Sequence, residues 1–188
     1  MDRGDLMDNL IPRYLFHITL CKQLESIDRY GLGRENNDLY LIDFDPRNYL
    51  DSEPHHLTED QVDQLLMIIG ILLDNKSNMD IAVITINTRY LNNDRLEKDR
   101  EENIWNYYDV IHQFNVDCFE ISIAEREDSN FQVLPSIEFS EQLLECFGNT
   151  EHLYCRRIEW SEEEEEIENS EECEEDEEDT QSSQSSDE

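Results

Sequence analysis

Residues 161–188, SEEEEEIENSEECEEDEEDTQSSQSSDE, set the strongest limit on what this chain can fold into. The segment has no Lys or Arg, and its only apolar residues are Ile167 and Cys173. So few apolar side chains cannot bury enough surface to offset the entropy that a chain loses on ordering. We therefore expect a flexible N-terminus at residues 1–9, one folded domain at residues 10–157 and a disordered acidic tail at residues 158–188.

Negative charge dominates the expected domain as well as the tail. The chain has 48 acidic and 14 basic residues, and its formal net charge is −34. Seventeen of the acids and none of the bases lie from Glu159 onward, which leaves residues 1–158 with a net charge of about −17. Direct nucleic-acid binding is disfavoured, because it normally uses Lys and Arg to displace counterions from phosphates. The charge fits a basic protein partner, mimicry of a DNA backbone, or solubility alone.

The cysteines and the N-terminus indicate an intracellular protein, cytoplasmic or nuclear. Five cysteines are scattered along the chain, and no two have the CxxC spacing of a zinc site or a redox pair. The start MDRGDLMDN has no apolar signal region, and no apolar run is long enough to cross a membrane. We expect no metal site, since the neighbours His55 and His56 have no third ligand at suitable spacing.

The hydrophobic pattern predicts a single α+β domain with short strands and few helices. The expected strands lie at 14–18, 39–44, 81–86, 116–124 and 131–140. The expected helices lie at 20–30, 57–75 and 140–148. Segment 90–105 is polar and predicts a loop with a helical turn. Ile104, Tyr108 and Ile111 share one face at helical spacing, which predicts that they pack in the core.

Three local signals set the expected helix ends. Thr19 is a candidate cap for the first helix, and Gly31 followed by an apolar residue is typical of its end. Thr58 and Gln61 have the spacing of a capping box at the start of the long helix. Gly70 interrupts that helix and weakens it by roughly 1 kcal/mol relative to Ala.

The stretches LFHITLCKQLESIDRYGL and DLYLIDFDPRNY together resemble the first half of the ADP-ribosyltransferase fold. In the diphtheria-toxin-like branch and related families, a strand L-x-H-x-T precedes a helix of the form xxLxSIxxxGL and a strand like xxYLA. The resemblance covers residues 14–49 and, more loosely, residues 118–139. It implies a split antiparallel sheet with a cleft for NAD, and an activity that transfers ADP-ribose from NAD to a macromolecule.

The resemblance also implies roles for particular side chains. His17 would hydrogen-bond the adenosine ribose, with Thr19 close to it. Tyr49 or Tyr40 would stack on the nicotinamide ring. Glu120 would stabilise the positive charge that develops as the glycosidic bond breaks.

Other residues enter the resemblance less directly. Glu138 is a second choice for the carboxylate, and NFQVLPSIEF has the family's Q-hydrophobic-x-P form. Arg13, Arg34 and Arg47 lie near the predicted cleft. The sequence departs from the family at Ile18, where a small residue usually follows the His and gives the dinucleotide room.

Three functions stay open at this point. One is ADP-ribosyl transfer, for which a basic protein target suits the charge better than a nucleic acid, and one is a catalytically inactive relative with the same fold. The third is a non-enzymatic acidic protein that binds the basic surface of a nucleic-acid-binding protein, as a DNA mimic, an inhibitor or an acidic chaperone. In that third case His17 is an ordinary core histidine. An enzyme should have a neutral or locally basic cleft around His17, whereas a mimic should present rows of paired carboxylates.

Overall fold

The computed structural model describes residues 10–33, 39–51, 57–99, 103–125, 130–134, 141–148 and 152–160. The expected flexible N-terminus and the acidic tail from residue 161 onward lie outside the described residues. So do Arg34, the His55–His56 pair and Glu138. Among the described residues, no helix is long and apolar enough to cross a membrane.

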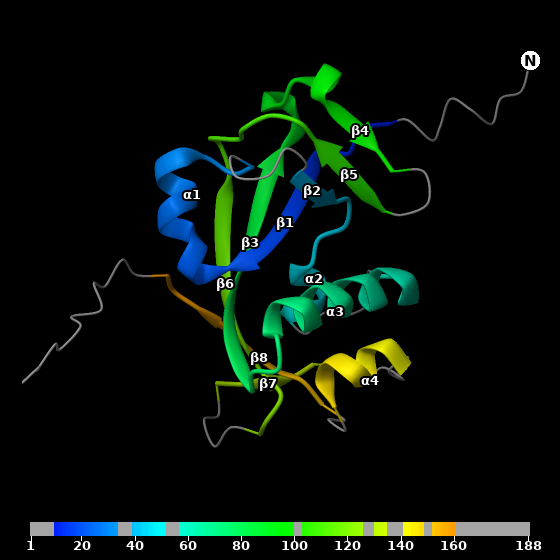
Figure 1. Ribbon diagram of the computed structural model, residues 1–188, viewed down its shortest axis with the longest axis vertical. Coiled ribbons are helices and arrows are strands. Elements are labelled where there is room, and N and C mark those ends of the chain that lie inside the picture. Colours follow the sequence, from blue (N-terminus) through cyan, green and yellow to red (C-terminus); the bar gives the residue numbers. More distant parts are fainter. Residues whose placement is uncertain are drawn as a thin grey trace, which may run out of the picture.

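The described residues form one antiparallel sheet with four α-helices, which confirms the predicted α+β class (Figure 1). The strand order is β4-β5-β2-β1-β3-β6-β8-β7. The strands are β1 (Tyr14–Leu20), β2 (Leu39–Ile42), β3 (Asn78–Asn87), β4 (Leu96–Lys98), β5 (Ile104–Tyr107), β6 (Asn115–Ser122), β7 (Gln132–Val133) and β8 (Tyr154–Ile158). The α-helices are α1 (Leu24–Tyr30), α2 (Arg47–Leu50), α3 (Glu59–Leu73) and α4 (Glu141–Phe147), and the 3-10 turns are η1 (Cys21–Gln23), η3 (Thr88–Tyr90) and η4 (Asn93–Arg95).

The sheet has a separate hydrophobic core on each face. Side chains alternate along a strand, so Leu15 of β1 packs on one face and Phe16 and Ile18 pack on the other. Leu24 of α1 belongs to the same core as Leu15, whereas α3 and α4 cover the face of Phe16. Figure 1 shows α1 apart from the other three helices, which lie together near the lower half of the sheet. Alternation along β1 therefore decides which side chains can meet α1.

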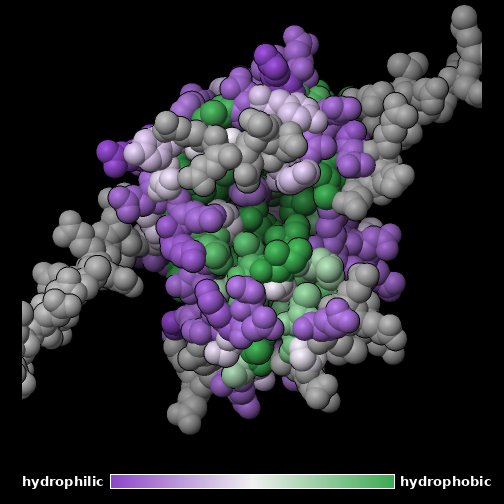
Figure 2. Space-filling model, in the orientation of Figure 1, coloured by the Kyte–Doolittle hydropathy of each residue, from purple (hydrophilic) through white to green (hydrophobic). Residues whose placement is uncertain are grey.

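The strands β1 and β2 meet at the narrowest junction of the sheet. Their register consists of the single pair Phe16↔Ile42, whereas seven pairs join β1 to β3. The sheet is nevertheless continuous across this junction. Figure 2 shows hydrophobic surface gathered where β1 and β2 pass α3, with hydrophilic side chains around it.

The helix α3 begins as the sequence predicts. The Thr58 side chain accepts a hydrogen bond from the Gln61 N–H, and the Gln61 side chain accepts one from the Thr58 N–H, which completes the capping box. Gly70 has a second role, because a Cβ atom there would lie 2.6 Å from the Cβ atom of Cys146 in α4. The glycine therefore lets α3 and α4 approach closely, at a cost in helix propensity.

Several element predictions are wrong. Residues 104–107 form the strand β5, not part of a helix, and β4 and β8 occupy segments where no strand was expected. Thr19 caps no helix, since it lies in β1 and α1 begins only at Leu24. Gly31 has a positive φ of 85°, as expected, but its ψ of 158° is extended rather than left-handed helical.

Candidate functional site

A hollow lies between β1 and α1, and its lining includes two of the predicted site residues. Its volume is about 520 Å³. Its lining consists of His17, Thr19, Lys22, Gln23, Ser26, Ile27, Tyr30, Gly31, Leu32, Gly33 and Leu39. Among the residues that the structure describes, this lining contains no Asp or Glu and one Lys, although acids outnumber bases by 48 to 14 in the whole chain. We call this hollow the His17 pocket.

His17 enters the pocket from the middle of β1 and is held by the neighbouring strand. Its Nδ1 atom lies 3.0 Å from the carbonyl oxygen of Tyr40 in β2. A carbonyl oxygen only accepts, so the neutral ring carries its proton on Nδ1 and leaves the lone pair of Nε2 available. Burial lowers the pKa of His17 below its ordinary value, against the opposing effect of the Tyr40 hydrogen bond. The residue is thus a neutral imidazole that can accept a hydrogen bond.

The remaining polar groups of the pocket come from η1 and α1. Thr19 is buried, and its hydroxyl donates to the side-chain oxygen of Gln23. Lys22 and Ser26 are exposed residues of the pocket lining, and Tyr30, which also lines the pocket, is 41% exposed. The pocket therefore offers one positive charge, several hydrogen-bonding groups and one aromatic ring.

Neither tyrosine chosen from the sequence contributes a ring to this pocket. Tyr49 is 2% exposed and belongs to the core of Phe16, on the opposite face of the sheet from His17. Burial raises its pKa above the ordinary value. Tyr40 contacts His17 only through its backbone carbonyl, and the Phe16↔Ile42 register places its exposed ring on the face of Phe16. The predicted stacking role of Tyr40 or Tyr49 beside His17 is therefore not supported by the arrangement.

Glu120 lies on the same face of the sheet as His17 but far from it. His17 pairs with Ile84 of β3, which pairs with Val116 of β6, and Glu120 is four residues further along β6. This offset is about 13 Å along the strands and about 10 Å across them. The carboxylate instead pairs with Arg156 of β8, with 2.6 Å between Oε2 and Nη2. The structure thus brings His17 and Thr19 together, but neither Glu120 nor Tyr49 joins them.

Glu120 also affects a second acid. Its partner across the ladder is Asp80 of β3. Burial raises the pKa of Asp80, the nearby Glu120 carboxylate raises it further, and Arg156 opposes both effects. Glu120, Asp80 and Arg156 form a local cluster of two acids and one base.

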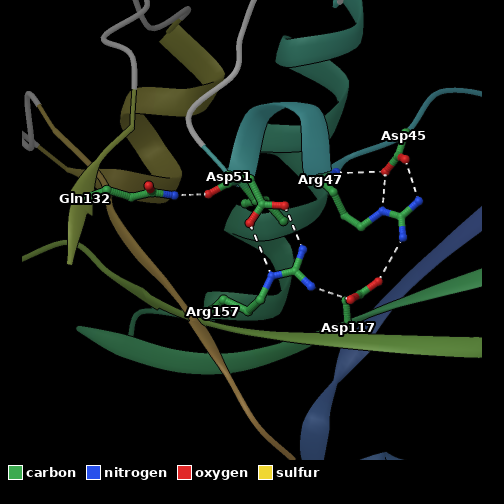
Figure 3. Close-up of polar contacts among 7 residues, drawn as sticks. Asp45, Arg47, Asp51, Asp117, Gln132 and Arg157 are labelled. Carbon is green, nitrogen blue, oxygen red and sulfur yellow. Dashed lines mark hydrogen bonds and ion pairs between the residues drawn. The ribbon is translucent and has the colours of Figure 1, made fainter. Parts of the chain in front are cut away.

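Arg47, which was expected near the cleft, belongs to an ion-pair network on the opposite face of the sheet from His17 (Figure 3). Asp117 of β6 accepts from both Arg47 and Arg157, at 2.9 and 2.5 Å. Arg47 also pairs with Asp45, and Arg157 also pairs with Asp51. This network ties α2 and the loop before it to β6 and β8, so Arg47 is fully engaged with carboxylates.

Gln132, from the expected Q-hydrophobic-x-P segment, lies near this network and not near His17. Its side-chain nitrogen donates to the carbonyl oxygen of Leu50 at the end of α2. The hydrogen bond fixes β7 against α2. Gln132 is therefore a structural contact of the α2 region.

Comparisons with protein-family models, with curated proteins and with solved structures found no match. The described part of the chain also contains no group of three or more His, Cys, Asp or Glu that could hold a metal ion. The site therefore has to be interpreted from its own geometry.

Sequence reasoning missed the pocket residues that come from η1 and α1. Tyr30 recurs at helical spacing with Leu24 and Ile27, which is typical of a packing position, yet it lines the pocket. A usable signal was present, because a helix that follows a strand directly must cover one face of that strand. The alternation that places His17 and Thr19 on one face also indicates which face that is.

Proposed function

We propose that the His17 pocket binds NAD and that the protein transfers ADP-ribose from NAD to a protein target. The observation that carries this proposal is that the described lining of the pocket has one Lys and no acid, in a chain with a net charge of −34. A dinucleotide with two phosphates meets less repulsion there than over a carboxylate-rich surface. A locally basic cleft around His17 is what an enzyme is expected to have, and the described lining supports that hypothesis.

The roles of the pocket residues follow from their chemistry. The Nε2 atom of His17 accepts a hydrogen bond from a hydroxyl of the adenosine ribose. Lys22 provides positive charge for a phosphate, and Tyr30 provides an aromatic face for a ring of the dinucleotide. NAD supplies the glycosidic bond to nicotinamide, which is the bond that breaks in the transfer.

The transfer also needs a carboxylate beside the nicotinamide ribose, to stabilise the oxocarbenium-like transition state. The described lining has none, and Glu120 is paired with Arg156 at a distance. The proposal therefore has two separable parts, which are NAD binding at His17 and ADP-ribosyl transfer with Glu120 as the candidate acid. The lining supports the first part, and the second is derived from the resemblance.

One pair of variants separates the structural role of His17 from its proposed role in binding. In His17→Asn the side-chain amide can still donate to the Tyr40 carbonyl, but the acceptor at Nε2 is lost. We expect calorimetry to show NAD binding about tenfold weaker, with the urea midpoint little changed. His152→Asn changes an exposed histidine outside the pocket and serves as the control. Equal NAD binding by His17→Asn and the unaltered chain would contradict the first part.

The second part is tested by release of nicotinamide from NAD in the presence of a basic protein such as histone. We expect release by the unaltered chain and its loss in Glu120→Gln, with NAD binding retained. Binding without any release would identify an inactive relative of the transferases. In that case the first part stands and the second fails.

A second candidate function is a non-enzymatic acidic protein that binds a basic surface. It is favoured by the net charge of −34 and by the engagement of Glu120 and Tyr49 in structural contacts. Deletion of residues 161–188 and a salt titration against a basic protein test it. Binding that changes with neither would contradict an electrostatic mechanism.

A further inference from the structure

Two Arg-Tyr dipeptides lie side by side at the end of the sheet where β1 begins and β3 ends. Arg13-Tyr14 opens β1, and Arg89-Tyr90 lies in η3, directly after β3. Tyr14 pairs with Asn87 in the ladder, and the Thr88 N–H donates to the Arg13 carbonyl at 3.1 Å. The Thr88 hydroxyl donates to the Pro12 carbonyl at 2.6 Å. These backbone contacts fix the two dipeptides relative to each other.

Each arginine lies over the ring of the tyrosine that follows it. The guanidinium carbon of Arg13 is 5.2 Å from the centroid of the Tyr14 ring, and that of Arg89 is 5.3 Å from the centroid of the Tyr90 ring. The side chains of Tyr14 and Tyr90 are 39% and 60% exposed. A guanidinium that stacks on a ring keeps its N–H groups free to donate in its own plane. Stacking therefore orders both arginines without using their hydrogen-bond donors.

A hollow of about 230 Å³ lies between these arginines. Its described lining consists of Ile11, Arg13, Asn87, Thr88, Arg89 and Asn93, none of which is acidic. The Asn87 side-chain oxygen accepts from the Arg89 N–H, which leaves the amide NH₂ as a possible donor. Asp94 follows Asn93 in sequence but is not part of the lining. Two positive charges thus share one hollow, and none of its described lining residues carries an opposite charge.

These two arginines differ from Arg47, Arg156 and Arg157 in their ion pairing. Those three all pair with carboxylates. Within the described part of the chain, neither Arg13 nor Arg89 has an acidic partner within salt-bridge distance, despite the excess of acids. Two neighbouring guanidinium groups repel each other, and an anion between them removes that repulsion.

We propose that this hollow binds the phosphate group of a nucleotide, with the base beside Tyr14 or Tyr90. Arg13 and Arg89 pair with the phosphate, and the amides of Asn87 and Asn93 donate further hydrogen bonds. Exposed tyrosines next to a phosphate site are typical of proteins that stack unpaired bases. The Debye length is about 8 Å at physiological ionic strength, so distant carboxylates oppose a single phosphate only weakly. A long polyanion would instead extend over the acidic surface, which favours a free nucleotide or the end of a short single strand.

The proposal is tested with the full-length chain and adenosine 5′-monophosphate as the probe. We expect the probe to shift the backbone NMR signals of Asn87, Arg89 and Asn93, whereas adenosine without the phosphate leaves them unchanged. Arg13→Gln and Arg89→Gln should each weaken binding about tenfold, because each removes a charge-assisted hydrogen bond. Arg29→Gln is the matched control, since Arg29 lies 5.3 Å over the Tyr30 ring in the same kind of dipeptide away from the hollow. Circular dichroism checks that each variant is folded.

Two further arms identify the source of the phosphate. Tighter binding of a 5′-phosphorylated hexathymidylate than of the mononucleotide would indicate the end of a strand, and equal affinity would indicate a free nucleotide. Either result supports the site. Shifts at Lys22 and Ser26 alone would place the probe in the His17 pocket and overturn the proposal. Absence of binding at millimolar probe, or equal weakening by Arg29→Gln, would overturn it as well.

Discussion

Gly31 ends α1 in a conformation that few other residues adopt. Its φ is 85°, and a Cβ atom there would lie 2.3 Å from Cγ1 of Val110 and 2.8 Å from the His112 ring. The glycine therefore allows the chain to turn and also allows the segment before β6 to lie directly against the end of α1. The next residue, Leu32, then forms a bridge to Ile111. Gly31 and Leu32 both line the His17 pocket.

Gly31→Ala should destabilise the protein more than Gly148→Ala. Both positions have positive φ, but a Cβ atom at Gly148 would meet nothing within 4 Å. Backbone strain alone costs about 1–2 kcal/mol, and the overlap at Gly31 adds about 1–3 kcal/mol. Urea denaturation measures both costs. Equal losses of unfolding free energy would show that the segment with Val110 and His112 gives way easily.

His17 should make the stability of the protein sensitive to pH below neutrality. Burial lowers its pKa in the folded state, so below about 6.5 the unfolded state binds a proton that the folded state does not. Stability from this group is therefore full above about pH 6.5 and decreases as the pH falls. The loss between pH 6.5 and 5.5 is at most about 1.4 kcal/mol.

The measurement compares urea denaturation of the unaltered chain and His17→Asn from pH 7.5 to 5.5. We expect a flatter pH profile in the variant, because Asn does not titrate. The many carboxylates contribute equally to both proteins, so the difference isolates His17. His152→Asn should keep the profile of the unaltered chain, and a flatter profile there would show that another histidine is responsible.

At the scale of elements, α3 and α4 show how packing reverses a local preference. Helix propensity alone predicts that Gly70→Ala stabilises α3 by about 1 kcal/mol. The new Cβ atom would lie 2.6 Å from Cys146 Cβ and 3.0 Å from its Sγ. Pushing α4 away costs about 1–3 kcal/mol, so we expect a net loss of stability.

A double-mutant cycle with Cys146→Gly tests this explanation. Removal of the Cys146 side chain eliminates the closest atoms, so Gly70→Ala should be stabilising in that background. Urea denaturation of the four proteins gives the coupling free energy. A stabilising effect of Gly70→Ala on its own would mean that α4 adapts to the extra methyl group.

Elements with strong local signals could be predicted, and elements defined by their partners could not. The helix α3 has a capping box and a wide apolar face, and β1, β3 and β6 contain apolar runs. In β5, Trp105 and Tyr107 alternate as in a strand, but Ile104, Tyr108 and Ile111 fit a helix equally well. The pairing of β5 with β2 decides between them, and that contact is not local in sequence.

The same reasoning applies to the candidate site. His17 and Thr19 alternate within one strand, so their common face follows from local sequence. The positions of Tyr49 and Glu120 relative to His17 depend on which face of the sheet α2 covers and on how far β6 is shifted along β3. Only tertiary packing determines these two features. Arg156 and Arg157 were not predicted as partners because β8 itself was missed.

At the scale of the whole molecule, the ion-pair network opposes a large excess of negative charge. Asp117 connects Arg47 and Arg157, and through them α2 is joined to the far strands of the sheet. The Arg157 side chain is 50% exposed and that of Arg47 is 30% exposed. Partly exposed pairs of this kind contribute about 1 kcal/mol or less each. They therefore cannot offset the repulsion among the many unpaired carboxylates over the rest of the surface.

Added salt should consequently stabilise this protein, although salt weakens individual ion pairs. Raising NaCl from about 20 to 300 mM shortens the Debye length from about 20 Å to about 6 Å. That change screens the long-range repulsion of a net charge of −34 more than the close contacts around Asp117. We expect the urea midpoint to increase with NaCl, and to increase by a similar amount in KCl, because screening depends on ionic strength and not on the ion. Asp117→Asn should lower the midpoint but keep its dependence on salt, since the repulsion comes from the whole surface. A midpoint that falls with salt would show that the ion pairs, and not the net charge, dominate the electrostatics of the fold.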